Sequence, residues 1–250
     1  MTMSLAGKHA LVTGGGTGIG AAIAVALADA GAEVTICGRR KEPLEAIAKS
    51  RKTIHAEIAD VTDQKSIRGL YSKGHFDVVV ANAGGAQSAP AEKISADLWT
   101  NMLNVNLSGA FFSVQPALSG MRERHWGRII FIASTAGLKP YAYVAPYVAA
   151  KHGVVGLMRA LALETAKDSI TVNAVCPGYT ETPLFEKAVG RIVATTKRGE
   201  DAARALLAAN NPQGRITQPQ EVADAVLWLC AEGSAGITGQ SISVSGGETW

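Results

Sequence analysis

Short apolar runs alternate along the chain with longer, alanine-rich stretches whose apolar positions recur at the helical period. The apolar runs are rich in β-branched residues, and a continuous run such as Val78-Val79-Val80 is typical of a strand buried on both faces of a parallel sheet. Regular alternation of strand and helix patterns predicts a doubly wound α/β fold. The predicted strands are residues 9–13, 33–37, 53–57, 77–81, 128–132, 170–175 and 240–244.

Helical patterns fill the segments between these strands. They cover residues 18–30, 41–50, 63–72, 96–123, 146–166 and 220–231. The chain has no internal repeat, low-complexity tract or linker, so we expect one domain over residues 1–250.

One helical insertion, residues 183–211, interrupts the alternation after the sixth predicted strand. Insertions at the carboxyl ends of sheet strands usually sit over the ligand crevice. We therefore interpret this segment as a substrate lid, with plain surface decoration as the alternative.

Composition narrows the class of protein. The 250 residues are 47% hydrophobic and 18% charged, which excludes a disordered chain and is enough for a sizeable core. The longest apolar runs fall far short of the ~18 residues of a transmembrane helix, so we expect no membrane association. The N-terminal residues 1–8 lack a long apolar stretch, so we expect no signal peptide.

Charge and cysteine usage exclude further partners. The net charge of +3 is small and dispersed, which argues against a nucleic-acid partner. Cys37, Cys176 and Cys230 are scattered and lack the spacing of metal ligands, so we expect no metal site. Three cysteines that cannot all pair fit a reducing, cytoplasmic setting.

A glycine cluster follows the first predicted strand directly and opens a helix. It reads Thr13-Gly14-Gly15-Gly16-Thr17-Gly18-Ile19-Gly20. Glycines allow a tight turn in which backbone N–H groups approach a pyrophosphate closely, and the helix dipole favours that anion. The sequence therefore predicts a dinucleotide site at this turn.

The spacing Thr-Gly-x-x-x-Gly-x-Gly resembles that of the short-chain dehydrogenase/reductase family. The resemblance extends from Gly7 to Gly247 and implies a Rossmann-type fold with a seven-stranded parallel sheet flanked by helices. Its late portion, at residues 214–216 and 237–240, is most similar to 3-oxoacyl reductases and 3-hydroxyacyl dehydrogenases. In this turn it implies cofactor contacts from Gly14, Gly16, Thr17, Gly18, Ile19 and Gly20.

The end of the second predicted strand bears on the choice of cofactor. An acidic residue there would bind a ribose 2′-hydroxyl, as in NAD sites. This chain has Gly38 instead, followed by Arg39 and Arg40, and a guanidinium suits a 2′-phosphate. We therefore favour NADP(H) and keep NAD(H) possible, because Thr17 stands where many NADP-dependent relatives carry a basic residue.

The resemblance assigns further cofactor contacts beyond the glycine turn. Asp60 and Val61 correspond to the adenine-contacting position, and Pro177 and Gly178 begin the segment that holds the nicotinamide carboxamide. The complete set of further contacts is Asp60, Val61, Asn82, Ala83, Gly84, Tyr147, Lys151, Pro177, Gly178, Thr180 and Thr182.

Tyr147 and Lys151 stand four residues apart at the start of a predicted helix, so both side chains share one helix face. A tyrosine titrates near pH ~10 and becomes a useful acid or base at neutral pH when a cation stabilises its phenolate. Lys151 would supply that cation. Tyr141 and Tyr143 have no lysine four residues later, so we assign them no catalytic role.

Two polar residues complete the candidate catalytic set. Ser134 ends the fifth predicted strand, where its hydroxyl would face the ligand crevice and bind a substrate carbonyl. Asn106 falls inside a predicted helix, where it either faces solvent or, as the resemblance implies, bends the helix and holds a water beside the lysine. Asn106, Ser134, Tyr147 and Lys151 match the family's catalytic tetrad.

These residues imply an oxidoreductase that interconverts a ketone and a secondary alcohol by hydride transfer with NAD(P)(H). We favour a 3-oxoacyl thioester as substrate, CoA-linked rather than carrier-linked, with a small or cyclic ketone as the alternative. A dinucleotide-sensing regulator without catalysis would be expected to lose Tyr147 or Lys151.

Basic residues bear on the choice between these substrates, because the predicted lid could use them to bind thioester phosphates. An ordinary solvated helix face is the equal alternative. Arg124 and His125 partly suit carrier-protein docking, whereas Asp168 departs from that pattern. The resemblance also implies a homotetramer. The basic lid residues are Lys187, Arg191, Lys197, Arg198 and Arg204.

Overall fold

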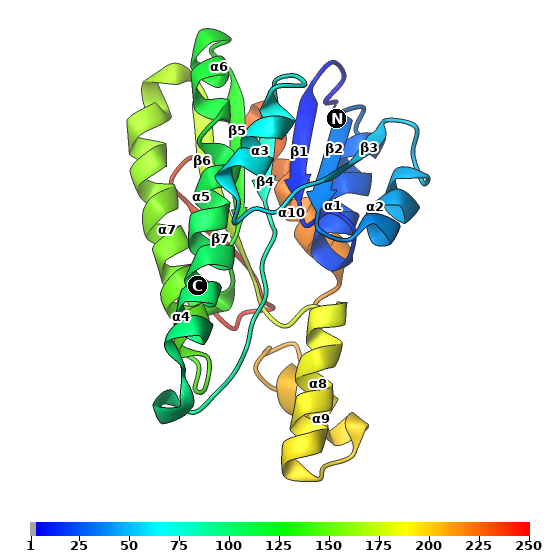
Figure 1. Ribbon diagram of the computed structural model, residues 1–250, viewed down its shortest axis with the longest axis vertical. Coiled ribbons are helices and arrows are strands. Elements are labelled where there is room, and N and C mark those ends of the chain that lie inside the picture. The colour runs from blue at the N-terminus through cyan, green and yellow to red at the C-terminus, as the bar shows by residue number, and fades with distance from the viewer. Residues whose placement is uncertain (1–3) are drawn as a thin grey trace.

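The computed structural model describes residues 4–250 and contains, within them, one seven-stranded parallel sheet (Figure 1). The strand order is β3-β2-β1-β4-β5-β6-β7, so the order reverses between β1 and β4. In such sheets ligands bind at the carboxyl ends of the strands beside this reversal. The strands are β1 (His9–Thr13), β2 (Glu33–Gly38), β3 (Ile54–Ile58), β4 (Val78–Ala81), β5 (Gly127–Ile132), β6 (Ile170–Pro177) and β7 (Ser241–Val244).

Helices cover both faces of the sheet, and alternate residues of each strand decide which helices they meet. Leu11 of β1 belongs to the core beneath α3, α5, α6 and α7, whereas Val12 belongs to the core beneath α1, α2 and α10. The doubly wound class predicted from the alternation of patterns is confirmed. The covering helices are α1 (Gly18–Asp29), α2 (Lys41–Ala48), α3 (Gln64–Tyr71), α5 (Gly109–Val114), α6 (Ala117–Glu123), α7 (Ala145–Thr165) and α10 (Pro219–Cys230).

The helix expected over residues 96–123 is divided, which corrects that prediction. The segment forms α4 (Ala96–Leu103), a π-helical turn (Asn104–Ser108), α5 and α6. The π turn coincides with Asn106, whose side-chain amide bonds to the backbone of Gly85. Pro116 precedes α6, and its missing N–H explains the break after α5.

The insertion after β6 forms two helices, α8 (Pro183–Thr196) and α9 (Glu200–Ala208), at the carboxyl end of the sheet (Figure 1). Phe185 and Val189 of α8 pack against Ala203 and Leu207 of α9 in a small apolar cluster. Lys197 has a φ of 57° and ends α8 in the left-handed region.

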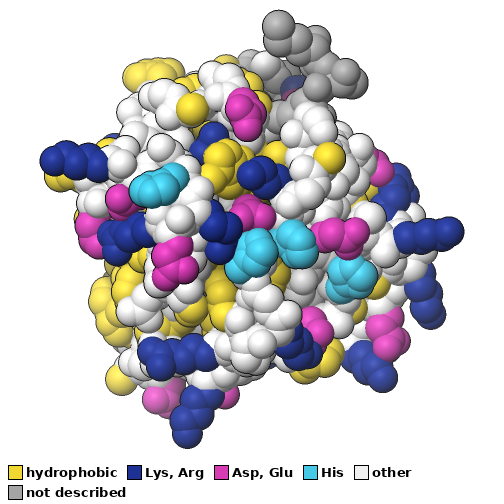
Figure 2. Space-filling view, turned by 90° about the horizontal axis from the view of Figure 1, so that it is seen from above, with side chains coloured by type: hydrophobic (Ala, Val, Ile, Leu, Met, Phe, Trp, Pro, Cys, Tyr) yellow, Lys and Arg dark blue, Asp and Glu magenta, His cyan; other side chains and the backbone are white. Residues whose placement is uncertain are grey.

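The opposite end of the molecule, whose surface Figure 2 shows, holds the amino-terminal ends of the strands (Figure 1). Arg124 lies here, and its Nε donates to Asp77 Oδ1 at 3.1 Å, next to the start of β4. Arg124 is therefore at the other edge from the strand ends that bind ligands, and its guanidinium is already committed to a carboxylate.

The expectations for a signal peptide and for a membrane-spanning helix concern different parts of the chain. Residues 1–3, part of the segment used to argue against a signal peptide, lie outside the described residues. Among residues 4–250, no helix is both long and apolar enough to cross a membrane.

Candidate active site

A cavity of about 880 Å³ opens at the carboxyl ends of the strands. It is lined by the turn after β1, by the ends of β2, β4, β5 and β6, and by the first turns of α7 and α8. The structure brings together in this cavity every residue that the sequence predicted for catalysis or cofactor binding. These are Gly14, Gly16, Thr17, Gly18, Ile19, Gly20, Arg39, Arg40, Asp60, Val61, Asn82, Ala83, Gly84, Asn106, Ser134, Tyr147, Lys151, Pro177, Gly178, Thr180 and Thr182.

The glycine turn has the shape that a pyrophosphate requires. Gly14 and Gly18 have φ values of 67° and 56°, which L side chains rarely adopt. A Cβ on Gly20 would lie 2.4 Å from the carbonyl oxygen of Gly14, so α1 begins in direct contact with the turn. The N-terminus of α1 thus faces the cavity, and because glycine has no side chain its backbone N–H groups are open to a ligand. The turn therefore fits a dinucleotide phosphate.

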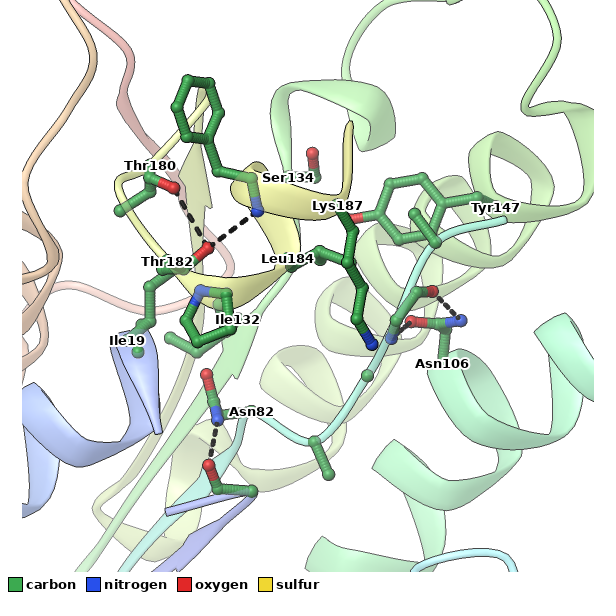
Figure 3. A pocket seen from close by; sticks show the side chains of 18 of the residues that line it. Ile19, Asn82, Asn106, Ile132, Ser134, Tyr147, Thr180, Thr182, Leu184 and Lys187 are labelled. Carbon is green, nitrogen blue, oxygen red and sulfur yellow. Dashed lines mark hydrogen bonds between the residues drawn. The ribbon is translucent and has the colours of Figure 1, made fainter. Parts of the chain in front are cut away.

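Asn82 joins the ends of β1 and β4 beneath this turn (Figure 3). Its Nδ2 donates to the carbonyl oxygens of Thr13 at 2.8 Å and Gly14 at 3.3 Å. The Thr13 hydroxyl in turn accepts from the backbone N–H groups of Asn82 and Ala83. Asn82 therefore holds the glycine turn in place, a role that a pattern of consecutive residues does not reveal.

Arg39 and Asp60 lie at the end of the cavity formed by β2 and β3. The Arg39 side chain is 74% exposed, and its Nη1 is 4.0 Å from Asp60 Oδ2. Asp60 accepts from the backbone N–H and the hydroxyl of Thr62, and these bonds help to hold its pKa below the usual range. Arg39 is consequently only loosely held and can turn toward a ligand phosphate.

Ser134 follows β5, and α7 presents Tyr147 and Lys151 to the same cavity. The Nζ of Lys151 donates to the carbonyl oxygen of Ile132 at 2.7 Å and lies 5.6 Å from the centroid of the Tyr147 ring. Burial lowers the pKa of Lys151 to about 8 and raises that of Tyr147 to about 12, an increase that the Ser134 hydroxyl opposes. Burial thus outweighs the hydrogen bond with Ser134, which by itself would lower the pKa of Tyr147.

Asn106 is buried, with 1% of its surface exposed, so the solvent-facing alternative is wrong. Its Oδ1 accepts from the N–H of Gly85 at 3.1 Å, and its Nδ2 donates to the carbonyl oxygens of Gly85 and Met102, each at 2.9 Å. A Cβ on Gly84 would lie 2.7 Å from Asn106 Oδ1, which explains the glycine there. The asparagine joins the π turn to the loop that follows β4.

The segment from Pro177 to Thr182 crosses the cavity opposite Tyr147 and Asn106 (Figure 3). The Thr182 hydroxyl donates to the carbonyl oxygen of Thr180 at 3.0 Å and accepts from the N–H of Phe185 at 3.3 Å. Thr182 therefore also caps the N-terminus of α8, beyond the cofactor contact that the resemblance assigned to it.

The basic residues of the insertion differ in their surroundings. Lys187 and Arg191, four apart on α8, line the cavity. Arg204 instead pairs with Glu186 of α8, Glu200 of α9 and Glu181 just before α8, so its charge is already neutralised. In the described part of the chain, neither Lys187 nor Arg191 has a carboxylate oxygen within 4.0 Å.

Several cavity residues were not assigned a role from the sequence. Tyr141 and Tyr179 contribute aromatic surface, and Leu184 and Phe185 contribute apolar surface from α8. No spacing rule singles these residues out, because they come from loops and a helix that only the fold brings together.

Comparison with known proteins agrees with this geometry. The sequence profile of the short chain dehydrogenase family matches residues 8–191. The granaticin polyketide synthase putative ketoacyl reductase 1 of Streptomyces violaceoruber is 37% identical over 249 residues, which cover 95% of this chain and 92% of that protein. The acetoacetyl-CoA reductase of Shinella zoogloeoides is 37% identical over 246 residues, covering 96% and 98% of the two chains.

A solved structure is similar throughout. The crystal structure of an actinorhodin polyketide ketoreductase variant with NADPH superposes with a TM-score of 0.91 at 36% identity, covering 96% of this chain and 97% of that one. The chain therefore belongs to the short chain dehydrogenase family, as an oxidoreductase that acts on CH–OH groups with a nicotinamide dinucleotide.

Proposed function

We propose that this protein reduces 3-oxoacyl thioesters, preferentially CoA-linked, with NADPH. The observation that carries the proposal is the meeting of Asn106, Ser134, Tyr147 and Lys151 with the glycine turn in one cavity. The similarity to ketoacyl and acetoacetyl-CoA reductases over nearly the full chain supports the substrate class.

The dinucleotide, when bound, supplies the hydride. The Ser134 hydroxyl donates a hydrogen bond to the substrate carbonyl oxygen and stabilises the charge that develops there. The Tyr147 hydroxyl donates its proton to the same oxygen. With its pKa raised to about 12 the phenol is protonated at neutral pH, and it becomes an effective proton donor because a cation stabilises the phenolate that forms.

Lys151 and Asn106 support this proton transfer. The ammonium of Lys151, fixed by the carbonyl of Ile132, stabilises the phenolate left behind and binds the ribose of the nicotinamide. Asn106 acts as a positioning residue, because its amide fixes the Gly85 backbone and its π turn borders the same cavity. In this way it supports a proton relay to Lys151.

Two features support the preferences within the proposal. Arg39, loosely held near Asp60, suits the 2′-phosphate of NADPH. The helices α8 and α9 act as a substrate lid, and Lys187 and Arg191 give its cavity side a positive charge suited to the phosphates of CoA.

Purified protein assayed with NADPH and NADH tests this function. The panel comprises acetoacetyl-CoA, its N-acetylcysteamine thioester, and a small cyclic ketone. We expect NADPH-dependent reduction of both thioesters, with the lower KM for the CoA thioester. Turnover of the cyclic ketone alone would refute the thioester proposal, and equal use of NADH would refute the cofactor preference.

We also propose that the protein forms a homotetramer, as the family resemblance implies. Leu107, Phe111, Phe112 and Leu157 line an apolar surface hollow of about 320 Å³ beside α5 and α7, which supports an interface there. Light scattering after size exclusion tests this, and a monomer at micromolar concentration would refute it.

A further inference from the structure

A carboxylate from the end of the chain contacts a residue that lines the active-site cavity. After β7, Gly246 and Gly247 have φ values of 62° and 96°, and the chain turns back. The turn is held by Thr249, whose N–H donates to Ser245 Oγ and whose hydroxyl bonds with that of Ser243 at 2.6 Å. This turn directs Glu248 into the protein, where its side chain is only 1% exposed.

The buried carboxylate is committed to specific partners. Glu248 Oε1 accepts a short hydrogen bond from the Tyr141 hydroxyl and lies 2.9 Å from Lys139 Nζ. The Tyr141 hydroxyl also bonds with Thr135 Oγ1 at 2.7 Å. A buried carboxylate is costly unless it is paired and hydrogen-bonded, and Lys139 and Tyr141 satisfy both conditions.

These contacts hold the segment between two catalytic residues. Thr135 follows Ser134 directly, and Tyr141 lies six residues before Tyr147. Both Thr135 and Tyr141 line the cavity, so Glu248 holds the wall of the cavity at Tyr141 directly and at Thr135 through the Tyr141 hydroxyl. Burial and the nearby Glu248 carboxylate raise the pKa of Tyr141. Tyr141 is therefore a poor proton donor and contributes its ring surface to the cavity.

The same carboxylate lies close to Gly178, which also lines the cavity. Glu248 Oε2 lies 3.0 Å from the position that a Cβ on Gly178 would take, and Gly178 lines the cavity on the β6 side. Glu248 thus lies between the loop that carries Tyr141 and Gly178, and a side chain at residue 178 would crowd it.

We propose that Glu248 is a positioning residue for the carbonyl substrate: it holds the Tyr141 ring as a fixed wall beside Ser134 and Tyr147, and thereby sets which substrates fit. This inference rests on the proposed reductase function. It adds a determinant contributed by a residue 107 positions away from Tyr141 in the chain.

The test is a double-mutant cycle of Glu248→Gln and Tyr141→Phe, with Trp250→Ala as a control in the same tail, because Trp250 is fully exposed. Glutamine preserves the shape of the buried side chain but loses the charge that pairs with Lys139. We expect each single variant to raise KM for acetoacetyl-CoA about tenfold, with kcat less affected. The Kd for NADPH, measured by fluorescence, should stay within about twofold in all variants.

Because Tyr141→Phe removes the hydrogen bond between Tyr141 and Glu248, and Glu248→Gln weakens the same bond by removing the charge of the acceptor, the double variant should be no worse than the poorer single one. Additive effects, or an unchanged KM in Glu248→Gln with an active wild type, would overturn the proposal. A wild type that reduces no carbonyl would refute the reductase function itself. Urea unfolding of the wild type, the two single variants and the double variant then tests whether Glu248 holds Tyr141. Shifts of the urea midpoint that add in the double variant would overturn this contact.

Discussion

The Nζ of Lys151 donates a hydrogen bond to the carbonyl oxygen of Ile132 at 2.7 Å, which ties helix α7 to the end of strand β5. Ser134 lies two residues beyond Ile132, and Tyr147 lies one helical turn before Lys151. One buried ammonium therefore fixes the relative position of the two elements that carry Ser134 and Tyr147. The same burial makes Lys151 easy to deprotonate.

The titration of Lys151 predicts a pH limit for the reaction. Its pKa, lowered to about 8, means that the ammonium is charged below that pH and neutral above it, whereas Tyr147 stays protonated up to about pH 12. We expect kcat/KM for NADPH, which reports groups of the free enzyme, to fall as the pH rises through about 8. In Lys151→Arg the falling limb should disappear, at lower overall activity. A flat profile in the wild type, or the same limb in the variant, would contradict this assignment.

Arg39 predicts the discrimination between the two cofactors. Arg39→Ala removes the cation next to Asp60 and should weaken NADPH binding about tenfold or more, because a charge-assisted contact to phosphate is lost. Binding of NADH should change little. Fluorescence titration measures both, with Arg51→Ala as the control, since Arg51 pairs with Asp29 outside the cavity. If the binding of NADPH and that of NADH were weakened equally, Arg39 would not contact the 2′-phosphate.

Gly20 tests the close packing under the cofactor turn. In Gly20→Ala the new methyl group would meet Gly14 O at 2.4 Å and Asn82 Nδ2 at 2.5 Å. We expect a loss of about 2 kcal/mol in the free energy of unfolding, the usual cost of overpacking. Gly156→Ala is the matched control, because nothing lies within 4 Å of its Cβ position in α7. There the better helix propensity of alanine should add up to about 1 kcal/mol. If the urea midpoint moved equally in both variants, the close packing of Gly20 against Gly14 and Asn82 would be contradicted.

The fold and most of the site follow from local sequence patterns. The strands, the glycine turn and the Tyr147–Lys151 pair each occupy a few consecutive residues, so spacing and periodicity reveal them. The division of the predicted helix at Asn106 does not follow from these patterns, because it depends on a bond to Gly85 from another loop. The contact between Tyr141 and Glu248 is equally invisible, since only the completed sheet brings the two residues together.

The two cavity-facing cations of α8 predict a dependence on substrate charge. Lys187→Ala and Arg191→Ala should each raise KM for acetoacetyl-CoA several-fold and leave that for an uncharged cyclic ketone unchanged. Added salt should reduce the difference, because it screens exposed charges. Arg198→Ala is the control, because this residue lies between α8 and α9 and does not line the cavity. If Arg198→Ala raised KM for acetoacetyl-CoA as much, the net charge of the protein, and not the position of Lys187 and Arg191 in the cavity, would be responsible.

Tyr147→Phe tests the central claim, that the phenol of Tyr147 is the proton donor for carbonyl reduction. The change removes one oxygen atom and keeps the half-buried ring beside Lys151. Single-turnover reduction of acetoacetyl-CoA with NADPH bound in advance is the measurement. A rate lowered by about 10³-fold, with the Kd for NADPH unchanged, is the predicted result. A variant that keeps most of the wild-type rate would contradict the account.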